Sequence, residues 1–473
     1  MAVTRPHTTS LSPATSSFAE LGVPSALARA LKEQGIETPF AIQAATLPSS
    51  LAGLDVLGRG RTGSGKTYAF VLPVLARLAG SAARPRPGRP RALILAPTRE
   101  LASQIEGAMA PLAKALSLRT LAVFGGVGAG PQISALRAGV DIVVACPGRL
   151  TDHLESGHVR LDAVEITVLD EADHMADLGF LPAVQRLLAR TPANGQRLLF
   201  SATLDAGVDV LVRRFMTDPV IHSVDSDRSP VAAMQHHVLH LRADQRLPVL
   251  VDLASAPGRT LVFTRTKHRA KVLTRQLVAS GVPAVELHGN LGQSARTRNL
   301  DAFATGTAAV LVATDIAARG IHVDDVALVV HADPPVEHKA YLHRSGRTAR
   351  AGAMGTVVTL MTDEQLTDVR DLTRKAGIKA TITKLGAGHP LLAEIAPGER
   401  SLTPPPAKQP SANRPPRRRG GGKSTKRRVP SAQAEPKPGA RRGQSAAHVA
   451  SNGRSGAASF SAATRVGTRR GTR

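Results

Sequence analysis

Eight short runs of continuous apolar residues constrain the fold of this chain more than any other feature. They lie at residues 92–97, 141–147, 166–173, 197–203, 259–266, 308–315, 327–333 and 355–360. Continuous apolar runs of this length are typical of strands buried on both faces, which occur in parallel sheets. Helical stretches such as residues 99–116 and 267–280 separate the runs. This alternation predicts an α/β fold with parallel sheets.

The domain organisation follows from length and from one interruption of the pattern. A chain of 473 residues is too long for a single core. The polar stretch at residues 222–235 breaks the alternation and predicts an interdomain linker. The expected domain boundaries are a leader at 1–17, a first domain at 18–222, a linker at 223–232, a second domain at 233–395 and a tail at 396–473.

The charge of the chain is concentrated at its C-terminal end. Residues 401–473 hold 17 Lys and Arg against one acid, Glu435, which is a net charge of +16 out of +25 for the whole chain. This segment is also rich in Pro, Gly and Ser, so we expect it to be disordered. Such a basic balance indicates a polyanionic partner, nucleic acid first and an anionic membrane second. The tail is interpreted as an RNA tether, with a solubilising extension as the alternative.

Other compositional features narrow the location of the protein. The single cysteine, Cys146, excludes an internal disulfide framework and suits a reducing compartment. No apolar run reaches the ~18 residues of a membrane-spanning helix, and the polar leader does not resemble a secretory signal. We therefore expect a cytoplasmic protein without a membrane partner. We also expect the protein to be a monomer.

The sequence GRGRTGSGKT supplies the spacing of a phosphate-binding loop. Gly60, Gly65, Lys66 and Thr67 form G-x-x-x-x-G-K-T between a short strand-like segment and a helical one. Glycines let backbone N–H groups close around phosphates at a helix N-terminus, while the lysine and hydroxyl serve phosphate and Mg²⁺. The alternative is a glycine-rich turn with a solvated lysine. The strand–loop–helix context favours a nucleotide site, and we expect ATP and Mg²⁺ as cofactors.

A cluster of carboxylates follows the apolar run at 166–169. Asp170, Glu171 and Asp173 arrive almost together. On their own they fit either a metal and water-activating site or the acidic first turn of a helix. Beside a phosphate-binding lysine the first interpretation is favoured, with Asp170 holding Mg²⁺ and Glu171 orienting the attacking water.

Together these segments resemble the DEAD-box RNA helicases of superfamily 2. The motifs that carry the resemblance are GSGKT, PTRELA (97–102), Gly125–Gly126, CPGR (146–149), DEAD (170–173), SAT (201–203), ATDIAARG (313–320) and HRSGRTAR (343–350). The resemblance covers residues 18 to 365. It implies two tandem RecA-like domains with ATP in the cleft between them.

The resemblance also implies roles for individual residues. Gln43 would read adenine, with Phe18 as the upstream aromatic residue. The loop residues Thr62, Gly63, Ser64, Gly65, Lys66 and Thr67 would hold the phosphates, with Mg²⁺ on Thr67 and Asp170. Arg347 and Arg350 of the second domain would stabilise the γ-phosphate. Asp173, Ser201, Thr203 and His343 would couple the two domains.

RNA contacts are implied for a further set of residues. They are Pro97, Thr98, Arg99, Gly125, Gly126, Pro147, Gly148, Arg149, Gln293, Arg296 and Thr314. All of these match motifs that contact the nucleic-acid backbone, so binding is expected to be independent of base sequence and sensitive to salt. Contacts to 2′-hydroxyl groups would favour RNA over DNA.

Three segments depart from the family pattern. The usual Pro-Thr-Pro becomes Pro39-Phe40-Ala41, and Cys146 replaces a usual Thr. Cys146 is interpreted as a small buried hydrophobe. His322 stands where the family usually has an Asp that contacts ribose, so we expect weaker use of ATP. A His322→Asp variant should have the lower Michaelis constant for ATP.

The sequence predicts an ATP-dependent RNA helicase that unwinds short duplexes locally or remodels RNA–protein complexes. An ATP-gated RNA clamp or ribosome-assembly scaffold would use the same motifs, and a translocating DNA helicase is a more distant alternative. Ribosome-assembly and RNA-degradation partners both stay open, as does the physiological RNA.

Overall fold

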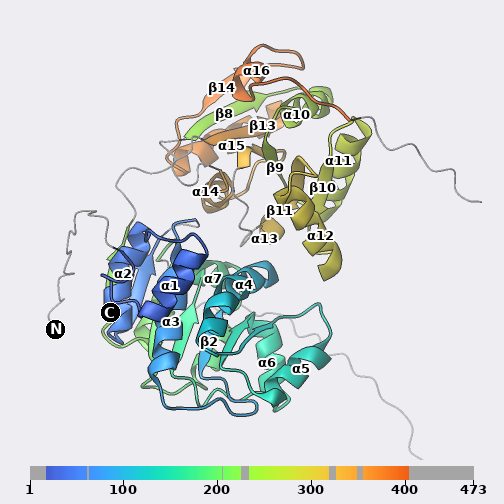
Figure 1. Ribbon diagram of the computed structural model, residues 1–473. Helices are drawn as coiled ribbons and strands as arrows, with labels where there is room; N and C mark the ends of the chain where they lie inside the picture. Colours follow the sequence, from blue (N-terminus) through green and yellow to red (C-terminus); the bar gives the residue numbers. More distant parts are fainter. Residues whose placement is uncertain are drawn as a thin grey trace, which may run out of the picture. The chain divides into compact units, whose positions relative to one another are not determined.

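The structure is a computed structural model that describes residues 17–60, 63–204, 206–224, 234–318, 326–348 and 355–403. The expectations for most of the leader and linker, for Thr62, His322 and Arg350, and for the tail beyond residue 403 lie outside these ranges. The described residues form two parallel sheets, each with its own helices (Figure 1).

The first sheet has seven parallel strands in the order β3-β4-β2-β5-β6-β1-β7. The strands are β1 (Val56–Arg59), β2 (Ala92–Leu95), β3 (Thr120–Val123), β4 (Ile142–Ala145), β5 (Ile166–Leu169), β6 (Gln196–Ser201) and β7 (Val220–Ser223). The helices are α1 (Ser25–Glu33), α2 (Ala41–Leu51), α3 (Lys66–Gly80), α4 (Arg99–Ala115), α5 (Ala129–Ala138), α6 (Pro147–Glu155), α7 (Ala172–Asp177), α8 (Leu181–Leu188) and α9 (Ala206–Phe215).

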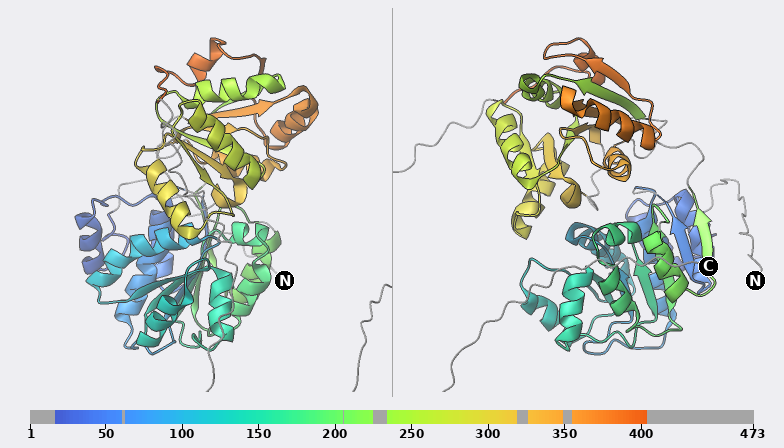
Figure 2. Two further views of the ribbon diagram at one scale, coloured as in Figure 1. Left: turned by 90° about the vertical axis from the view of Figure 1, so that its right-hand side faces the viewer. Right: turned by 180° about the vertical axis from the view of Figure 1, so that it is seen from behind.

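Helices cover both faces of this sheet (Figure 2). In β2, Ala92 and Ile94 pack in one core with α1 to α4, whereas Leu93 and Leu95 pack in a second core with α5 to α9. A strand buried on both faces needs apolar residues at every position, and this explains the continuous runs in the sequence.

The second sheet is built in the same way, in the order β10-β11-β9-β12-β13-β8-β14. Its strands are β8 (Met234–His240), β9 (Arg259–Thr264), β10 (Ala284–Leu287), β11 (Val310–Thr314), β12 (Val326–His331), β13 (Gly355–Met361) and β14 (Thr381–Lys384). The helices α10 (Arg246–Ala254), α11 (Lys267–Ala279) and α16 (Leu391–Ile395) cover one face. The other face packs against α12 (Gln293–Ala304), α13 (Asp315–Ala318), α14 (His338–Ser345) and α15 (Leu366–Lys375), and the 3₁₀ turns η2 (Ala243–Gln245) and η3 (Asp363–Gln365) complete the second domain.

The predicted fold class is confirmed. Each of the eight apolar runs overlaps a strand, and every strand pair within the two sheets is parallel. Within the described ranges, no helix combines the length and apolar character needed to cross a bilayer.

The described chain continues in contact with the second sheet beyond the expected boundary at 395. The Arg400 guanidinium donates from Nε to Asp252 Oδ1 at 2.7 Å. The backbone N–H groups of Ser401 and Thr403 donate to the carbonyl oxygens of Ser255 and Gly281 at 2.9 and 2.7 Å. These bonds hold the chain against the amino-end edge of the sheet up to residue 403.

Candidate active site

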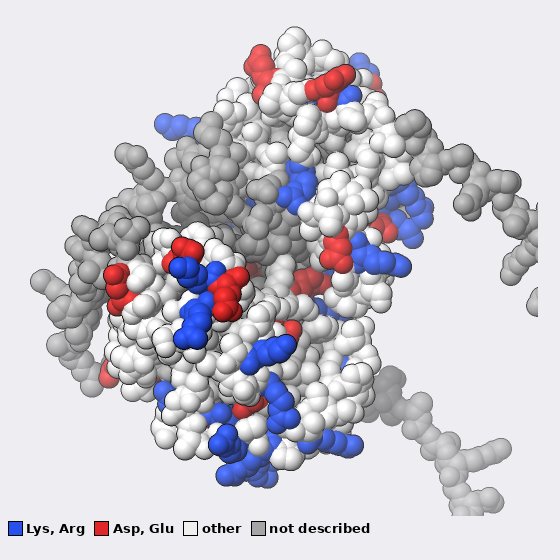
Figure 3. All heavy atoms as spheres, viewed as in Figure 1, with Lys and Arg blue, Asp and Glu red and all other residues white. Residues whose placement is uncertain are grey.

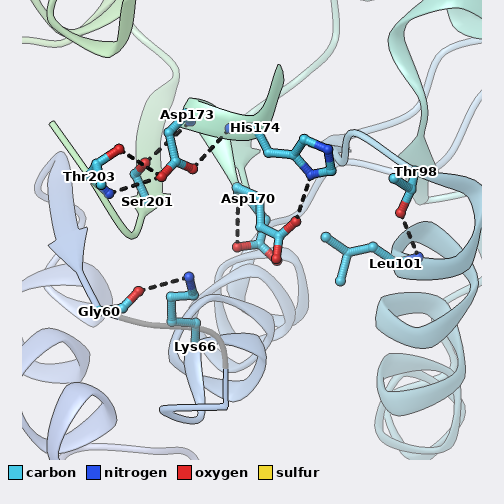
Figure 4. A network of polar contacts seen from close by, with 10 residues as sticks. Gly60, Lys66, Thr98, Leu101, Asp170, Asp173, His174, Ser201 and Thr203 are labelled. Atoms are coloured by element: carbon cyan, nitrogen blue, oxygen red, sulfur yellow. Dashed lines mark hydrogen bonds and ion pairs between the residues drawn. The ribbon is translucent and has the colours of Figure 1, made fainter. Parts of the chain in front are cut away.

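The phosphate-binding loop connects β1 to α3, and its shape depends on glycine. Gly63 and Gly65 have φ angles of +86° and +87°, a region that other residues rarely adopt. A Cβ atom on Gly65 would lie only 2.7 Å from Gln43 Nε2. Lys66 begins α3, and its ammonium group donates to the Gly60 carbonyl oxygen at 2.8 Å (Figure 4). The loop is therefore tightly closed, with the lysine and a helix N-terminus at its centre.

Asp170 and Glu171 follow β5, the strand next to β6 and β2 in the sheet. Both are buried, with 3% and 8% of their surface exposed. Glu171 has a left-handed backbone with φ of +50°, and its N–H donates to Asp170 Oδ1 at 3.0 Å. This strained conformation is uncommon for a residue with a side chain, and such strain is concentrated at functional sites.

His174 was not identified from the sequence as a site residue. It lies on α7, and its Nδ1 donates to Glu171 Oε2 at 3.1 Å (Figure 4). Because the pair is three residues apart on a helix, the two side chains share one face. The sequence signal that would have identified His174 is its i, i+3 spacing from Glu171 within DEADHM.

The two neighbouring carboxyl groups differ strongly in pKa. Burial raises the pKa of Asp170 to about 7, against the lowering effect of Lys66. Burial alone would also raise the pKa of Glu171, but the hydrogen bond and charge of His174, helped by Arg347, bring it to about 2. Glu171 is therefore ionised and can accept a proton or orient water, whereas at Asp170 the charge of Lys66 does not offset the effect of burial, which leaves a deficit of positive charge.

That deficit fits a divalent cation beside Asp170. Among the described residues, no group of three or more His, Cys, Asp and Glu side chains could hold a metal ion by itself. Mg²⁺ commonly uses one or two protein oxygens together with waters and substrate phosphates. Asp170 and the Thr67 hydroxyl are the protein oxygens that would serve.

Three of the predicted coupling residues form one hydrogen-bonded group. Asp173 Oδ2 accepts from the backbone N–H and the hydroxyl of Thr203, both at 2.9 Å (Figure 4). The Asp173 N–H donates to Ser201 Oγ at 3.3 Å. The SAT segment (201–203) therefore connects the end of β6 to the start of α7 through hydrogen bonds.

One cavity is lined by residues of both domains. It is lined by Lys66, Glu171, Asp173, His174, Ala202, His343 and Arg347. The predicted partners His343 and Arg347 thus lie beside the carboxylates and the phosphate-binding lysine. Arg347 is 7% exposed, and its charge acts on Glu171.

The predicted adenine-reading residues occupy different surroundings. Gln43 is 1% exposed; its Oε1 accepts from the Phe40 N–H at 2.9 Å and its Nε2 donates to the Gly65 carbonyl at 2.8 Å. Phe18 is 3% exposed and packs in the core of the first domain. Phe40, which was noted only as a departure, is 52% exposed.

The predicted RNA residues of the first domain lie where strands end. Pro97 to Arg99 follow β2, Gly125 and Gly126 follow β3, and Pro147 to Arg149 follow β4. These strands are parallel neighbours, so their carboxyl ends share one edge of the sheet. Thr98 Oγ1 caps α4 by accepting from the Leu101 N–H at 3.2 Å. Arg149 donates to the Val127 carbonyl at 3.2 Å, and the Arg99 guanidinium lies against Gly126, so the three segments adjoin one another.

Cys146 lies on the same edge, directly before α6. It is 9% exposed, and burial, followed by the charge of Glu100, raises the pKa of its thiol to about 12. The thiol is therefore protonated and inert, as expected for a small buried hydrophobe.

In the second domain, the predicted phosphate ligand Arg296 is already paired. Its Nε donates to Glu100 Oε1 at 2.7 Å, and only 8% of the residue is exposed. Gln293 Oε1 accepts from Arg99 Nη1, and its Nε2 donates to Glu100 Oε1, both at 3.3 Å. Burial would raise the pKa of Glu100, but Arg296 outweighs this and lowers it. Glu100 was part of PTRELA but had no assigned role.

Comparison with known proteins agrees with this geometry. Residues 40–211 match the family model of the DEAD/DEAH box helicases, and residues 244–352 match that of the helicase conserved C-terminal domain. The chain is 36% identical over 391 residues to the DEAD-box ATP-dependent RNA helicase CshA of Bacillus licheniformis, covering 82% of this chain and 78% of that protein.

Two other relatives are longer than this chain. The chloroplastic DEAD-box ATP-dependent RNA helicase 3A of Zea mays is 40% identical over 370 residues, covering 76% of this chain and 49% of that protein. The ATP-dependent RNA helicase DBP2 of Chaetomium thermophilum is 38% identical over 369 residues, covering 75% and 65%. The chain thus spans about half of the maize protein and under two thirds of the fungal one.

Solved structures show the same fold. Dbp5 of S. cerevisiae bound to RNA and ADP BeF3 matches with a TM-score of 0.68 and 27% identity, covering 78% of this chain and 95% of that chain. Mss116p bound to ssRNA and AMP-PNP matches with a TM-score of 0.69 and 26% identity, covering 82% and 84%. The chain therefore belongs to the DEAD-box family of ATP-dependent RNA helicases, and its two parallel sheets are the tandem RecA-like domains of that family.

Proposed function

We propose that this protein is an RNA-stimulated ATPase that unwinds short RNA duplexes locally or remodels RNA–protein complexes. The observation that carries the proposal is the cavity that joins Lys66 and Glu171 of the first domain to Arg347 of the second. These are a phosphate-binding cation, an ionised carboxylate and an arginine, which are the parts that phosphoryl transfer to water requires.

The chemistry is divided among residues of both domains. The loop around Gly65 holds the phosphates through its backbone N–H groups, and Lys66 moves from the Gly60 carbonyl to the phosphate oxygens. Mg²⁺ on Asp170 and Thr67 would neutralise charge on the phosphates. Glu171 orients the water that attacks the γ-phosphorus and accepts its proton as the bond to the leaving ADP breaks, and His174 keeps the carboxylate in place. Arg347 stabilises the charge that develops on the transferred phosphoryl group.

Coupling to RNA depends on both sheets being engaged at once. The Asp173, Ser201 and Thr203 group lies beside the carboxylates, and the pair of Glu100 with Arg296 connects the strand-end surface of the first domain to α12. We propose that RNA on this surface favours the arrangement in which Arg347 reaches the nucleotide. RNA would then stimulate hydrolysis without any contact to its bases.

The test is strand release from a short RNA duplex, measured in ATP and in a non-hydrolysable analogue. We expect wild-type protein to release the strand and to turn over repeatedly in ATP. Glu171→Gln should bind RNA and ATP but turn over at least about 100-fold more slowly, as for loss of a general base. Glu155→Gln, on the exposed part of α6, is the matched control and should behave as wild type.

An ATP-gated clamp would give a different result. It would bind RNA tightly in ATP and hydrolyse ATP, yet release no strand from the duplex. DNA-stimulated hydrolysis at the rate seen with RNA would instead revive the DNA-helicase alternative.

The basic tail is proposed to tether RNA without sequence preference. On the face shown in Figure 3, basic and acidic side chains of the described residues are interspersed. Most of the net charge comes from residues 401–473. Because Ser401 and Thr403 bond to the second domain, the deletion to test removes residues 404–473. It should weaken RNA binding and flatten its salt dependence while leaving ATPase activity without RNA unchanged. An unchanged salt slope would argue against tethering.

A further inference from the structure

Phe40 presents an unusual surface beside the phosphate-binding loop. It directly precedes α2, and a Cβ on Gly65 would lie 2.8 Å from its Cδ2 and 2.9 Å from its Cγ. One edge of the ring therefore lies against the loop that holds the phosphates. The residue is nevertheless 52% exposed, more than most large apolar residues in the described part of the chain.

The ring adds little to the stability of the first domain. It belongs to none of the hydrophobic clusters formed by the described residues, whereas its neighbours Ile36 and Ile42 both pack in the first core. An exposed aromatic ring outside the core gains little from the hydrophobic effect. Phe40 is thus available to a ligand.

The other two residues expected at the base are committed elsewhere. Phe18 is buried in the core, where its ring faces protein. Gln43 is 1% exposed, and its oxygen and one of its N–H groups already bond to the Phe40 N–H and the Gly65 carbonyl. A carboxamide has two N–H donors and one oxygen, so only part of its capacity is left to read a base.

We propose that Phe40 is the aromatic platform on which the base of the bound nucleotide stacks. The inference rests on the proposed function, namely that the loop around Lys66 binds the phosphates of a nucleotide. A nucleotide seated there extends its base away from the helix N-terminus, and Phe40 is the exposed apolar surface adjoining the loop. Stacking is largely independent of base identity because every base has a π-face.

The first test uses the absence of tryptophan from the chain. Phe40→Trp introduces a single tryptophan at the proposed contact, and its emission reports stacking directly. We expect ADP and GDP to quench the emission in proportion to the sites they fill. Tripolyphosphate, which has no base, should bind without quenching it. Emission that ADP leaves unchanged while calorimetry shows ADP bound would overturn the proposal.

The second test measures how much the contact contributes to nucleotide affinity. Phe40→Ala should lower affinity for ADP and for GDP by the same factor, about tenfold, as expected for one base–aromatic stack. Affinity for tripolyphosphate should not change, and Phe40→Tyr should retain wild-type values. Leu54→Ala, which alters another exposed apolar residue of this domain, is the matched control.

The outcomes separate the inference from the function beneath it. If Phe40→Ala lost affinity for ADP alone, or if its affinities equalled those of the wild type, the role of Phe40 would be refuted. Base recognition would then be assigned to Gln43. If wild-type protein bound neither ADP nor tripolyphosphate, the proposed nucleotide site itself would be wrong. Circular dichroism of each variant checks that the domain remains folded.

Discussion

The two domains repeat one strand topology but end their equivalent strands in different chemistry. Numbered within each sheet, both have the strand order 3-4-2-5-6-1-7. The fifth strand, β5 in the first sheet and β12 in the second, leads to a carboxylate in both, Asp170 and Asp333. The surroundings of these two carboxylates differ.

Asp333 is satisfied by groups of its own domain. Its Oδ2 accepts from the Arg265 N–H at 3.0 Å, and Oδ1 lies 3.5 Å from the Arg246 guanidinium. Asp170 Oδ1 accepts a hydrogen bond from the Glu171 N–H at 3.0 Å. The nearby Lys66 ammonium donates to the Gly60 carbonyl instead. One copy of the fold pairs its strand-end carboxylate with groups of its own domain, and in the other copy we propose that Mg²⁺ supplies the pairing.

The first strands differ in the same sense. β1 leads into a glycine loop with left-handed residues and a lysine, whereas β8 leads into η2 and α10, with no positive φ angle at residues 241–246. The second domain therefore has no phosphate-binding loop at the equivalent place. Its contribution to the cavity is Arg347 and His343 from the end of α14 and the turn after it. Two domains of the same strand topology thus supply different parts of the proposed site, the glycine loop with Lys66 in the first and Arg347 in the second.

Removing the contribution of the second domain should have the largest effect. Arg347→Ala should lower the ATPase rate by about 10³–10⁵, the range for arginine residues that act on the transferred phosphoryl group. Affinity for ADP should change little, because the effect is on the transition state. Steady-state kinetics with RNA measures this, and Arg275→Ala on the exposed part of α11 is the control. A purely raised Michaelis constant would contradict the assignment.

The paired aspartates test the comparison directly. Asp170→Asn should lower the ATPase rate about 10³-fold, because it removes a protein ligand of the metal. Asp333→Asn should leave the rate within about tenfold of wild type but lower the free energy of unfolding by about 1–3 kcal/mol, because the half-buried Arg246 guanidinium and the Arg265 N–H lose a charged acceptor. Equal effects of the two substitutions on ATPase would remove the distinction drawn between the strand ends.

Asp170 also makes the stability of the first domain depend on pH. In the metal-free protein, Asp170 is protonated in the folded state up to about pH 7, whereas an unfolded aspartate ionises near 3.8. The folded state therefore binds more protons between these values, and this group makes stability fall as pH rises. Asp170→Asn should remove that part of the slope and raise the free energy of unfolding above pH 7 by about 1–3 kcal/mol. Denaturant titrations in chelator across this range measure it, and an unchanged slope would contradict the prediction.

The smallest effect is expected at His174. His174→Ala removes the bond and charge that lower the pKa of Glu171, so that pKa should rise from about 2. The acid limb of the pH–rate profile should move to higher pH, with a fall in turnover of about tenfold or less. His174→Asn, which keeps an N–H donor, should restore most of the turnover. A lowered rate with an unmoved acid limb would point to a purely structural role.

The sequence was most informative where burial was most complete. Central strands such as β2 and β9 are covered on both faces, so they appeared as unbroken apolar runs. The edge strand β14 is largely exposed, and its sequence TITK, which alternates polar and apolar residues, gave no such signal. The edge strand β3 is half-buried, and its four residues TLAV were too few to be recognised. β8 was missed for another reason, because three histidines interrupt its apolar residues.

Site residues followed the same logic. Residues held by backbone geometry, such as Gly65 and Lys66, carry a spacing that is visible in the chain. Contacts between segments far apart in sequence, such as Glu100 with Arg296, carry none. The exposure of Phe40 and the burial of Phe18 also depend on packing, and no local pattern could have distinguished the two rings.

The bonds of Ser401 and Thr403 fix where the basic tail leaves the second domain. They attach the chain beside Ser255 and Gly281, near the amino ends of β9 and β10, while Thr314 lies at the carboxyl end of β11. The point at which the proposed tether is attached thus lies at the edge of the second sheet opposite to the one that holds Thr314. A single long RNA would then bind the protein at two separate places, and binding at the second place would be intramolecular. Affinity should then rise with RNA length until one molecule is long enough to engage both.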